Sequence, residues 1–255
     1  MLTTDRVARD LIRILGTELP PDPEIRITDL SIDESYQVQD LVVAERGEVA
    51  GYKVGCTSRA VRSAFGLSAP VSGRVLSHQV HRQQGAEPVV LSSITDLAVE
   101  PELVLHLGSD VSGTDLSDEV LRAAVVGVGA ALELHHYRFH YGPPTPQELV
   151  AGNALQAGLV LSADVQPLGE LDLDREGIGI WVDGELVESG VGAEILGGPL
   201  RSLRWLVDHL TARGRVLPAG SFVIPGSATG LIPVGPGRSV ESRFTRLGTC
   251  RARIR

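Results

Sequence analysis

Lysine is almost absent from this chain of 255 residues. The 23 basic residues include a single lysine, Lys53, so the other 22 are arginine. Arginine stays protonated and serves wherever a fixed positive charge is needed, whereas the pKa of an amine responds to its surroundings. Lys53 therefore either remains by chance after a codon bias replaced other lysines with arginine, or it has a role that requires an amine.

Cysteine and long apolar runs are scarce as well. Cys56 and Cys250 lie far apart and form neither a CxxC pair nor a disulfide framework, which is typical of a reducing cytoplasm. The longest apolar run, residues 123–132, is too short to cross a bilayer. Residues 1–16 lack the apolar segment of a signal peptide. The sequence predicts a cytoplasmic protein without a membrane partner.

Positive charge is in deficit. The formal net charge of −9 argues against nucleic acid or an anionic membrane as the main partner. A chain this acidic still needs local positive charge or a metal ion to hold an anionic small molecule. With 43% hydrophobic residues, it has ample material for a core.

The hydrophobic pattern predicts an α+β fold with mostly antiparallel or mixed strands. Helices are expected over residues 4–16, 31–44 and 199–213, and a hairpin is expected at Asp183-Gly184. Residues 97–108 and the segment that begins at residue 125 are predicted strands. These elements do not alternate in a βαβ rhythm, which argues against a parallel α/β sheet.

Acidic residues interrupt the two predicted strands. Glu100 and Glu102 are two residues apart, so their side chains share one face of a strand. Glu133 ends the most apolar stretch of the chain, where a lone carboxylate is unusual. Three carboxylates near strand ends predict an oxygen-rich site that suits a hard cation such as Mg²⁺ or Mn²⁺.

A plainer interpretation of these carboxylates is a half-exposed strand whose acidic face lies in water. Zinc is a weaker alternative, because the two cysteines are scattered and no HExxH motif is present. His135, His136 and His140 are interpreted as part of a surface loop.

Ordered motifs along the chain resemble the fumarylacetoacetate hydrolase superfamily, in its branch of 2-oxopent-4-enoate hydratases and 4-oxalocrotonate decarboxylases. "GYKVGCTSR" (51–59) is similar to a GYKIGLTS signature, "VEPELVLHLGSDV" (99–111) to a paired-glutamate metal motif, and "ALELHHYR" (131–138) to a third-glutamate motif. "VAGNALQAGLVLS" (150–162), "PGSATGLIPV" (225–234) and "VESRFTRLGTCRARI" (240–254) extend the match.

The resemblance implies a β-rich roll of mixed sheets flanked by helices over residues 49–255. Residues 1–48 would form a small helical segment packed on this catalytic domain. It also implies Mg²⁺ or Mn²⁺ bound by three ligands, Glu100, Glu102 and Glu133.

The same resemblance makes Lys53 an active-site lysine. A partly desolvated lysine beside a metal can have its pKa lowered toward neutrality, so it can hold or pass a proton. The resemblance further implies substrate-binding residues in a DNAS-like segment and a glycine-rich loop, namely Asn153, Gly226, Ser227 and Gly230.

Three departures from the family pattern set this chain apart. His78 stands where the hydratases carry an acidic residue that works with the lysine, and we predict it as a second catalytic residue. Gly152 and Leu155 replace polar residues of the DNAS-like segment, and residues 135–146 are unusually rich in His, Tyr and Pro. These changes predict an atypical substrate.

The sequence therefore predicts a metal-dependent lyase that acts on a 2-oxo acid or its dienol in aromatic compound catabolism, most simply as a hydratase. Decarboxylation of a 4-oxalocrotonate-type diacid is the first alternative. Hydrolysis of an acylpyruvate, with His78 or His106 as base, is another. A partner subunit without catalysis is a fourth. A homo-oligomer is expected, with a complex with a pathway neighbour as a further possibility.

Overall fold

Two sheets form the body of the molecule. The computed structural model describes residues 4–15, 27–92, 94, 96–136 and 143–255. The larger sheet has eight strands in the order β2-β1-β10-β5-β6-β7-β3, with β11 paired to β5. Its strands are β1 (Val49–Gly55), β2 (Val71–Leu76), β3 (Val80–Arg82), β5 (Leu97–Leu107), β6 (Val125–His136), β7 (Gln156–Gln166), β10 (Phe222–Ile224) and β11 (Ile232–Pro233).

The smaller sheet has five strands in the order β4-β13-β12-β8-β9. They are β4 (Val89–Leu91), β8 (Gly177–Val182), β9 (Glu185–Val191), β12 (Ser239–Phe244) and β13 (Gly248–Ile254). The α-helices are α1 (Thr4–Leu15), α2 (Ile32–Arg46), α3 (Arg59–Ala64), α4 (Asp118–Ala124), α5 (Pro146–Ala151) and α6 (Pro199–Ala212). Short 3₁₀ turns cover Ser77–Gln79, Asn153–Leu155, Leu173–Arg175 and Gly192–Glu194.

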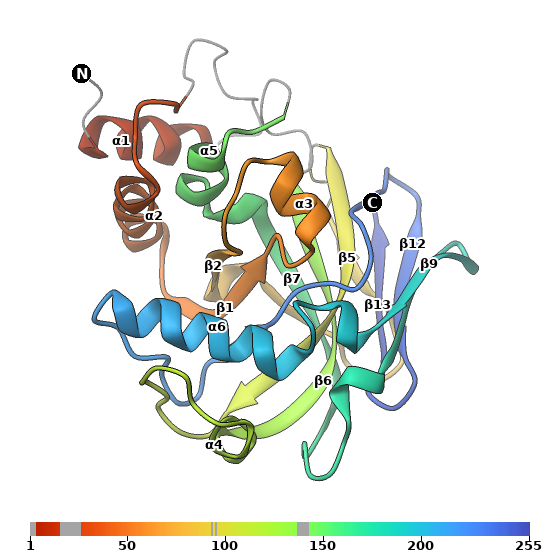
Figure 1. The fold of residues 1–255 in the computed structure, drawn as a ribbon. Helices are drawn as coiled ribbons and strands as arrows, with labels where there is room; N and C mark the ends of the chain where they lie inside the picture. The colour runs from red at the N-terminus through yellow and green to blue at the C-terminus, as the bar shows by residue number, and fades with distance from the viewer. Residues whose placement is uncertain (1–3, 16–26, 93, 95, 137–142) are drawn as a thin grey trace.

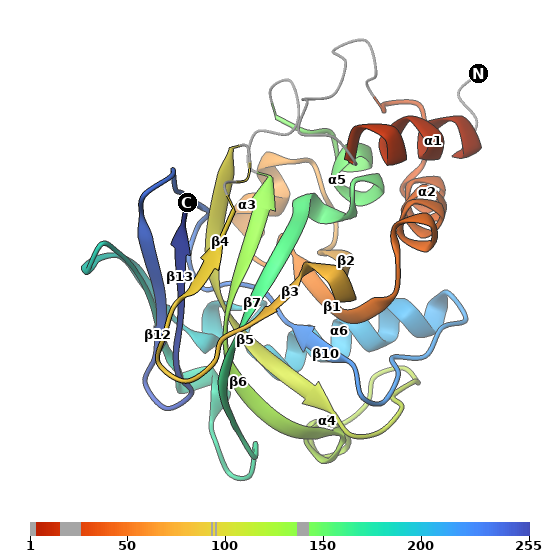
Figure 2. The same cartoon turned by 180° about the vertical axis from the view of Figure 1, so that it is seen from behind.

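The two sheets pack closely and enclose the main core with α6. Buried apolar side chains from β5, β6, β8, β12, β13 and α6 form one cluster. Ser242 Oγ donates to the Ala131 carbonyl at 2.9 Å, which joins β12 of the smaller sheet to β6 of the larger one. Figures 1 and 2 show the smaller sheet on one side of the larger sheet and α1 and α2 on the other. This arrangement confirms the predicted α+β roll of mixed sheets.

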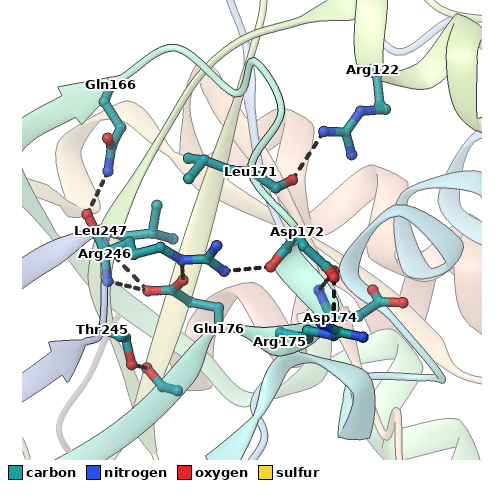
Figure 3. A network of polar contacts seen from close by, with 11 residues as sticks. Arg122, Gln166, Leu171, Asp172, Asp174, Arg175, Glu176, Thr245, Arg246 and Leu247 are labelled. Atoms are coloured by element: carbon teal, nitrogen blue, oxygen red, sulfur yellow. Dashed lines mark hydrogen bonds and ion pairs between the residues drawn. The ribbon is translucent and has the colours of Figure 1, made fainter.

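A buried carboxylate joins two distant loops of this roll. Glu176 is completely buried and accepts hydrogen bonds from the backbone N–H groups of Arg246 and Leu247 at 2.6 and 3.2 Å. Its other oxygen accepts from Arg246 Nε at 2.8 Å (Figure 3). The entry to β8 is thereby fastened to the turn between β12 and β13.

Local sequence signals explain the helix ends. Ser31 and Glu34 form the expected capping box at the start of α2, and Pro199 occupies the first turn of α6. Helix α5 is absent from the helices that the sequence predicted. Thr145 and Glu148 form a second capping box there, with Pro146 in the first turn. The Thr145–Glu148 spacing is a helix-start signal in the sequence, but the neighbouring prolines favoured a loop over a helix.

Helices α1 and α2 pack against α5, and α2 also contacts β2 of the larger sheet directly. Val7, Leu11, Val38, Val42 and Ala151 belong to one buried cluster that joins α1, α2 and α5. The division into residues 1–48 and 49–255 stays a prediction.

Candidate active site

Strands β5 and β6 bring two predicted metal ligands face to face. Their antiparallel register places Glu100 opposite Glu133 and Glu102 opposite Ala131. Directly paired residues, and residues two apart on one strand, share a sheet face. All three carboxylates therefore rise from the same face, and the small side chain of Ala131 leaves room beside Glu102.

Lys53 reaches this cluster from β1. Its Nζ lies 2.9 Å from Glu133 Oε1 and donates to the Ala154 carbonyl at 3.2 Å, with 2% of the residue exposed. Gly73 pairs with Lys53 across β1 and β2. A Cβ on Gly73 would lie 2.9 Å from Lys53 Cγ, so glycine is required for the aliphatic stem of the lysine to pass.

His135 completes a tight group that the sequence interpretation missed. Its Nε2 lies 3.1 Å from Glu100 Oε2 and 3.3 Å from Glu133 Oε2. Ligand atoms of Glu100, Glu133 and His135 all lie within 4.8 Å of one another. Assigning His135 to a surface loop was wrong, because the residue is 4% exposed. The signal was its spacing of two from Glu133, which places both side chains on one strand face.

Glu102 is buried beside this group but lies outside the 4.8 Å set. Its Oε2 accepts a hydrogen bond from the Gly226 N–H at 3.1 Å. The backbone of Gly226 has φ +116°, and a Cβ there would meet Thr57 Cγ2 at 2.4 Å. The close approach of this loop to Glu102 therefore depends on glycine.

The rest of the glycine-rich loop is held next to the carboxylates. Ser227 Oγ donates to the carbonyl of Pro101, the residue between Glu100 and Glu102, at 3.1 Å. The Gly230 N–H donates to Glu188 Oε2 at 3.1 Å. Gly226 and Ser227 thus border the cluster, whereas Gly230 fastens the other end of the loop to Glu188 of β9.

Opposite charges in this buried group shift one another's titration. Burial raises the pKa of Glu102 well above its usual value, and the carboxylates of Glu133 and Glu100 raise it further. Burial also raises the pKa of Glu133, but the Lys53 ammonium and His135 outweigh it and hold this pKa at about 2.

The carboxylates around Lys53 determine the direction of its pKa shift. Burial lowers this pKa, but the carboxylates of Glu133, Glu100 and Glu102 together outweigh burial and raise the pKa above the ordinary value for lysine. The predicted lowering concerns a lysine beside a bound metal ion and stays a prediction, whereas the protein groups alone raise the pKa of Lys53. The main cause is the ion pair at 2.9 Å, which stabilises the ammonium.

The donor set fits a divalent cation. Three carboxylates face one ammonium and one imidazole, and His135 Nδ1 is buried without a hydrogen-bond partner among the described residues. Buried acceptors that outnumber the neighbouring donors are costly unless a cation satisfies them. Carboxylate oxygens with one imidazole suit Mg²⁺ or Mn²⁺.

His78 does not lie in this cluster. It is exposed in the 3₁₀ turn after β2, and its Nδ1 is 3.4 Å from where a Cβ on Gly47 would lie. The strand register pairs Val49 with Leu76, so His78 lies beyond the entrance of β1. Lys53 is four residues further along that strand, roughly 13 Å away by strand rise. The prediction that His78 accompanies Lys53 is not supported by this geometry.

Asn153 is buried with its side chain committed to the protein. Its Oδ1 accepts from the Arg74 N–H and its Nδ2 donates to the Arg74 carbonyl, both at 2.8 Å. Both polar atoms of the amide are therefore engaged with β2, whereas the sequence predicted contact with substrate.

Known proteins resemble this chain over nearly its whole length. Residues 67–255 match the family described as "Fumarylacetoacetate (FAA) hydrolase C-terminal". A 4-oxalocrotonate decarboxylase from Pseudomonas sp. is 33% identical over 224 residues, 86% of each chain. A 2-keto-4-pentenoate hydratase from Paraburkholderia xenovorans (strain LB400) is 30% identical over 254 residues, 97% of this chain and 93% of that protein.

A solved structure supports the same relationship. The 4-oxalocrotonate decarboxylase from Pseudomonas putida G7, complexed with magnesium and adipate, matches with a TM-score of 0.87 at 26% identity. The match covers 100% of this chain and 99% of that protein. With its mixed-sheet roll and the family match over residues 67–255, the chain belongs to the fumarylacetoacetate hydrolase family.

Proposed function

We propose that this protein is a divalent-metal-dependent lyase that acts on a 2-oxo acid or its dienol. The specific reaction proposed is hydration of a 2-hydroxypenta-2,4-dienoate-type substrate to a 4-hydroxy-2-oxo acid. The observation that carries the proposal is the group of half-buried Glu100 with buried Glu133 and His135, with Glu102 beside it and Lys53 paired to Glu133.

The proposed cation is Mg²⁺ or Mn²⁺. Glu100, Glu102 and Glu133 would hold it, and His135 joins them as a further candidate ligand. When bound, the cation supplies Lewis-acid stabilisation of negative charge on the keto oxygen of a 2-oxo acid. The magnesium complex of the similar decarboxylase agrees with this choice.

Lys53 is the proposed catalytic residue of the chain itself. The Glu133 carboxylate and the Ala154 carbonyl fix its ammonium at the inner wall of the cluster. A fixed positive charge there would stabilise an anionic reacting group, and Lys53 is proposed to hold or pass a proton during the reaction. The loop with Gly226, Ser227 and Gly230 is proposed to border the substrate.

Decarboxylation of a 4-oxalocrotonate-type diacid is the second candidate. The 2-oxo acid would bind in the same way as for hydration. The distal carboxylate then leaves as CO₂, whereas in hydration water adds to the distal double bond. Its specific support is the 33% identity to a 4-oxalocrotonate decarboxylase.

The proposal is tested by binding and by product analysis. Calorimetric titration with Mg²⁺ and oxalate, an enolate mimic, should show binding that Glu102→Gln weakens. Release of CO₂ measured against hydrated product then separates the two reactions. No binding of Mg²⁺ and oxalate would favour a partner subunit without catalysis.

Two variants test the residue roles. Lys53→Arg should keep the charge and lower kcat about 100-fold or more, because a guanidinium neither releases its proton nor fits the same space. His78→Ala is the matched comparison and should keep kcat within about twofold, since this exposed side chain lies away from the cluster. A large loss in His78→Ala would restore the predicted catalytic role of His78.

Acylpyruvate hydrolysis receives less support, because it requires a general base close to the cluster. His106 lies six residues from Glu100 on β5, roughly 20 Å by strand rise. His78 is exposed beyond the entrance of β1. Pyruvate release from an acylpyruvate would nevertheless reveal this activity directly.

Assembly and location are also part of the proposal. We infer a cytoplasmic homo-oligomer in aromatic compound catabolism, with a pathway neighbour as an additional partner. Cys56 and Cys250 are free thiols, which agrees with a reducing compartment. No helix in the described ranges is long and apolar enough to cross a membrane. Sedimentation analysis of the purified protein measures the oligomer.

A further inference from the structure

A left-handed turn of three residues lies between α5 and β7. Asn153, Ala154 and Leu155 have φ angles of +58°, +54° and +61°. Asparagine visits this region readily, but alanine and leucine do so at a cost in free energy. Such a conformation persists only where surrounding contacts impose it, and it concentrates at functional sites.

The turn delivers one backbone carbonyl to the active-site lysine. The Ala154 carbonyl accepts a hydrogen bond from Lys53 Nζ at 3.2 Å, while Glu133 Oε1 lies 2.9 Å from the same nitrogen. Lys53 and Glu133 are 2% and 1% exposed. The direction of the ammonium is thus set by one carboxylate and by one carbonyl that the left-handed backbone presents.

The side chain of Asn153 fastens this turn to the strand beside Lys53. Its amide forms a reciprocal pair of hydrogen bonds with the backbone of Arg74, both at 2.8 Å. Arg74 follows Gly73, which pairs with Lys53 across β1 and β2. A Cβ on Gly73 would lie 3.1 Å from the Asn153 carbonyl oxygen and 2.9 Å from Lys53 Cγ. At Gly73, the backbone of β2 therefore packs directly against both the left-handed turn and the aliphatic stem of Lys53.

We propose that Asn153 is a positioning residue for Lys53: its amide locks the left-handed turn onto β2, so that the Ala154 carbonyl holds the ammonium beside Glu133. Asn153 then contributes to catalysis without touching substrate. This catalytic consequence rests on the proposed function, whereas the positioning itself does not.

The single lysine provides a direct measurement. Reductive methylation with formaldehyde and a borane modifies amines, so in this chain it reports Lys53 and the N-terminal amine only. Mass spectrometry of the peptides separates the two. In the folded protein with Mg²⁺ present, the buried ammonium of Lys53 should react slowly.

Three substitutions at Asn153 separate the amide from the backbone conformation. Asn153→Asp keeps the size but loses the donor, Asn153→Ala loses both hydrogen bonds, and Asn153→Gly retains the left-handed freedom without the amide. Each should raise the methylation rate of Lys53 about tenfold or more through local opening. With substrate, kcat should fall while KM changes within about threefold.

Two control variants test whether any substitution at a left-handed residue, or any loss of global stability, raises the methylation rate of Lys53. Asp115→Gly changes an exposed residue with φ +51° far from Lys53 and should leave the methylation rate within about twofold. Leu210→Ala removes a buried side chain of α6 and measures the effect of lowered global stability alone.

The outcomes are distinct. Wild-type methylation rates in folded Asn153→Ala or Asn153→Asp would overturn the proposal, and so would a protected lysine in Asn153→Gly. If only Asn153→Asp folds, its rate alone decides. A protected wild-type lysine without turnover of any 2-oxo acid would reject the proposed function but leave the positioning role intact.

Discussion

At the scale of single residues, the most informative contact is the ion pair of Lys53 and Glu133. Both side chains are almost fully buried, and their charged atoms lie 2.9 Å apart. A buried charge whose partner is removed keeps its desolvation penalty without compensation. The pair therefore contributes to stability as well as to the chemistry proposed for the site.

Glu133→Gln should lower the free energy of unfolding by about 3–5 kcal/mol, because it leaves the Lys53 ammonium buried and unpaired. Chemical denaturation in a metal chelator measures this. The double variant Lys53→Met with Glu133→Gln should recover part of the loss, since neither residue then carries an uncompensated charge. A Glu133→Gln variant as stable as the wild type would contradict the buried ion pair.

At the scale of elements, Glu176 joins the entry of β8 to the turn between β12 and β13. One carboxylate satisfies two backbone N–H groups and a guanidinium (Figure 3). Its neighbour Arg175 forms an ion pair with Asp172 at 3.3 Å but has 87% of its side chain exposed. The two residues allow a comparison of a buried and an exposed charge on adjacent positions.

Glu176→Gln should destabilise the protein by about 2–4 kcal/mol, because the amide cannot accept all three hydrogen bonds. Arg175→Ala should change stability by less than about 0.5 kcal/mol, as exposed pairs do. Denaturant midpoints of both variants provide the measurement, and equal effects at the two positions would refute the argument from burial.

Helices α2 and α6 meet at an aromatic cluster around His209. The His209 ring stacks on Trp205 at 5.0 Å and contacts Tyr36 at 4.7 Å. Burial lowers the pKa of His209 to about 4, helped by the charges of Arg213 and Arg74 and opposed by Asp33. The imidazole is therefore neutral in the folded protein near pH 6.

This shift predicts how stability depends on pH. Below its usual pKa of about 6.5, His209 binds a proton in the unfolded chain but not in the folded one. Its contribution is therefore fully present above that value and is lost as pH falls toward about 4. His209→Gln should lessen the loss between pH 7 and pH 5 by about 1–2 kcal/mol, after allowance for solvent screening. The prediction would be contradicted if the wild type and His209→Gln lost the same free energy of unfolding between pH 7 and pH 5.

At the scale of the whole molecule, the N-terminal helices are joined to the sheet by polar as well as apolar contacts. Gln39 Nε2 donates to the carbonyls of Ser72 and Val150 at 3.0 and 2.7 Å. The hydroxyl of Tyr36 accepts from the Ser72 N–H at 3.0 Å. Removing α2 would leave these buried backbone groups unsatisfied next to β2.

Hydrogen exchange should therefore show α2 opening only with the rest of the protein. We expect the slowest amides of α2 to exchange within about tenfold of those in β5 and β6. Exchange of α2 that is about a hundredfold faster or more would show that residues 1–48 open separately from residues 49–255.

The sequence by itself determined the local elements and the three glutamates. Strand periodicity placed Glu100 and Glu102 on one face, and the capping box at Ser31 located the start of α2. The same periodicity places His135 on the strand face of Glu133, although the sequence analysis did not use this spacing. Such signals are readable because they depend on residues a few positions apart.

Only the tertiary structure decided which of these residues meet. Lys53 and Glu133 are 80 positions apart in the sequence, yet the pairing of β1, β10, β5 and β6 in one sheet brings them to one ion pair. The same sheet leaves His78 at the far end of β1 and commits Asn153 to β2. Strand order and register depend on packing across the whole core, so residue spacing along the chain does not contain them.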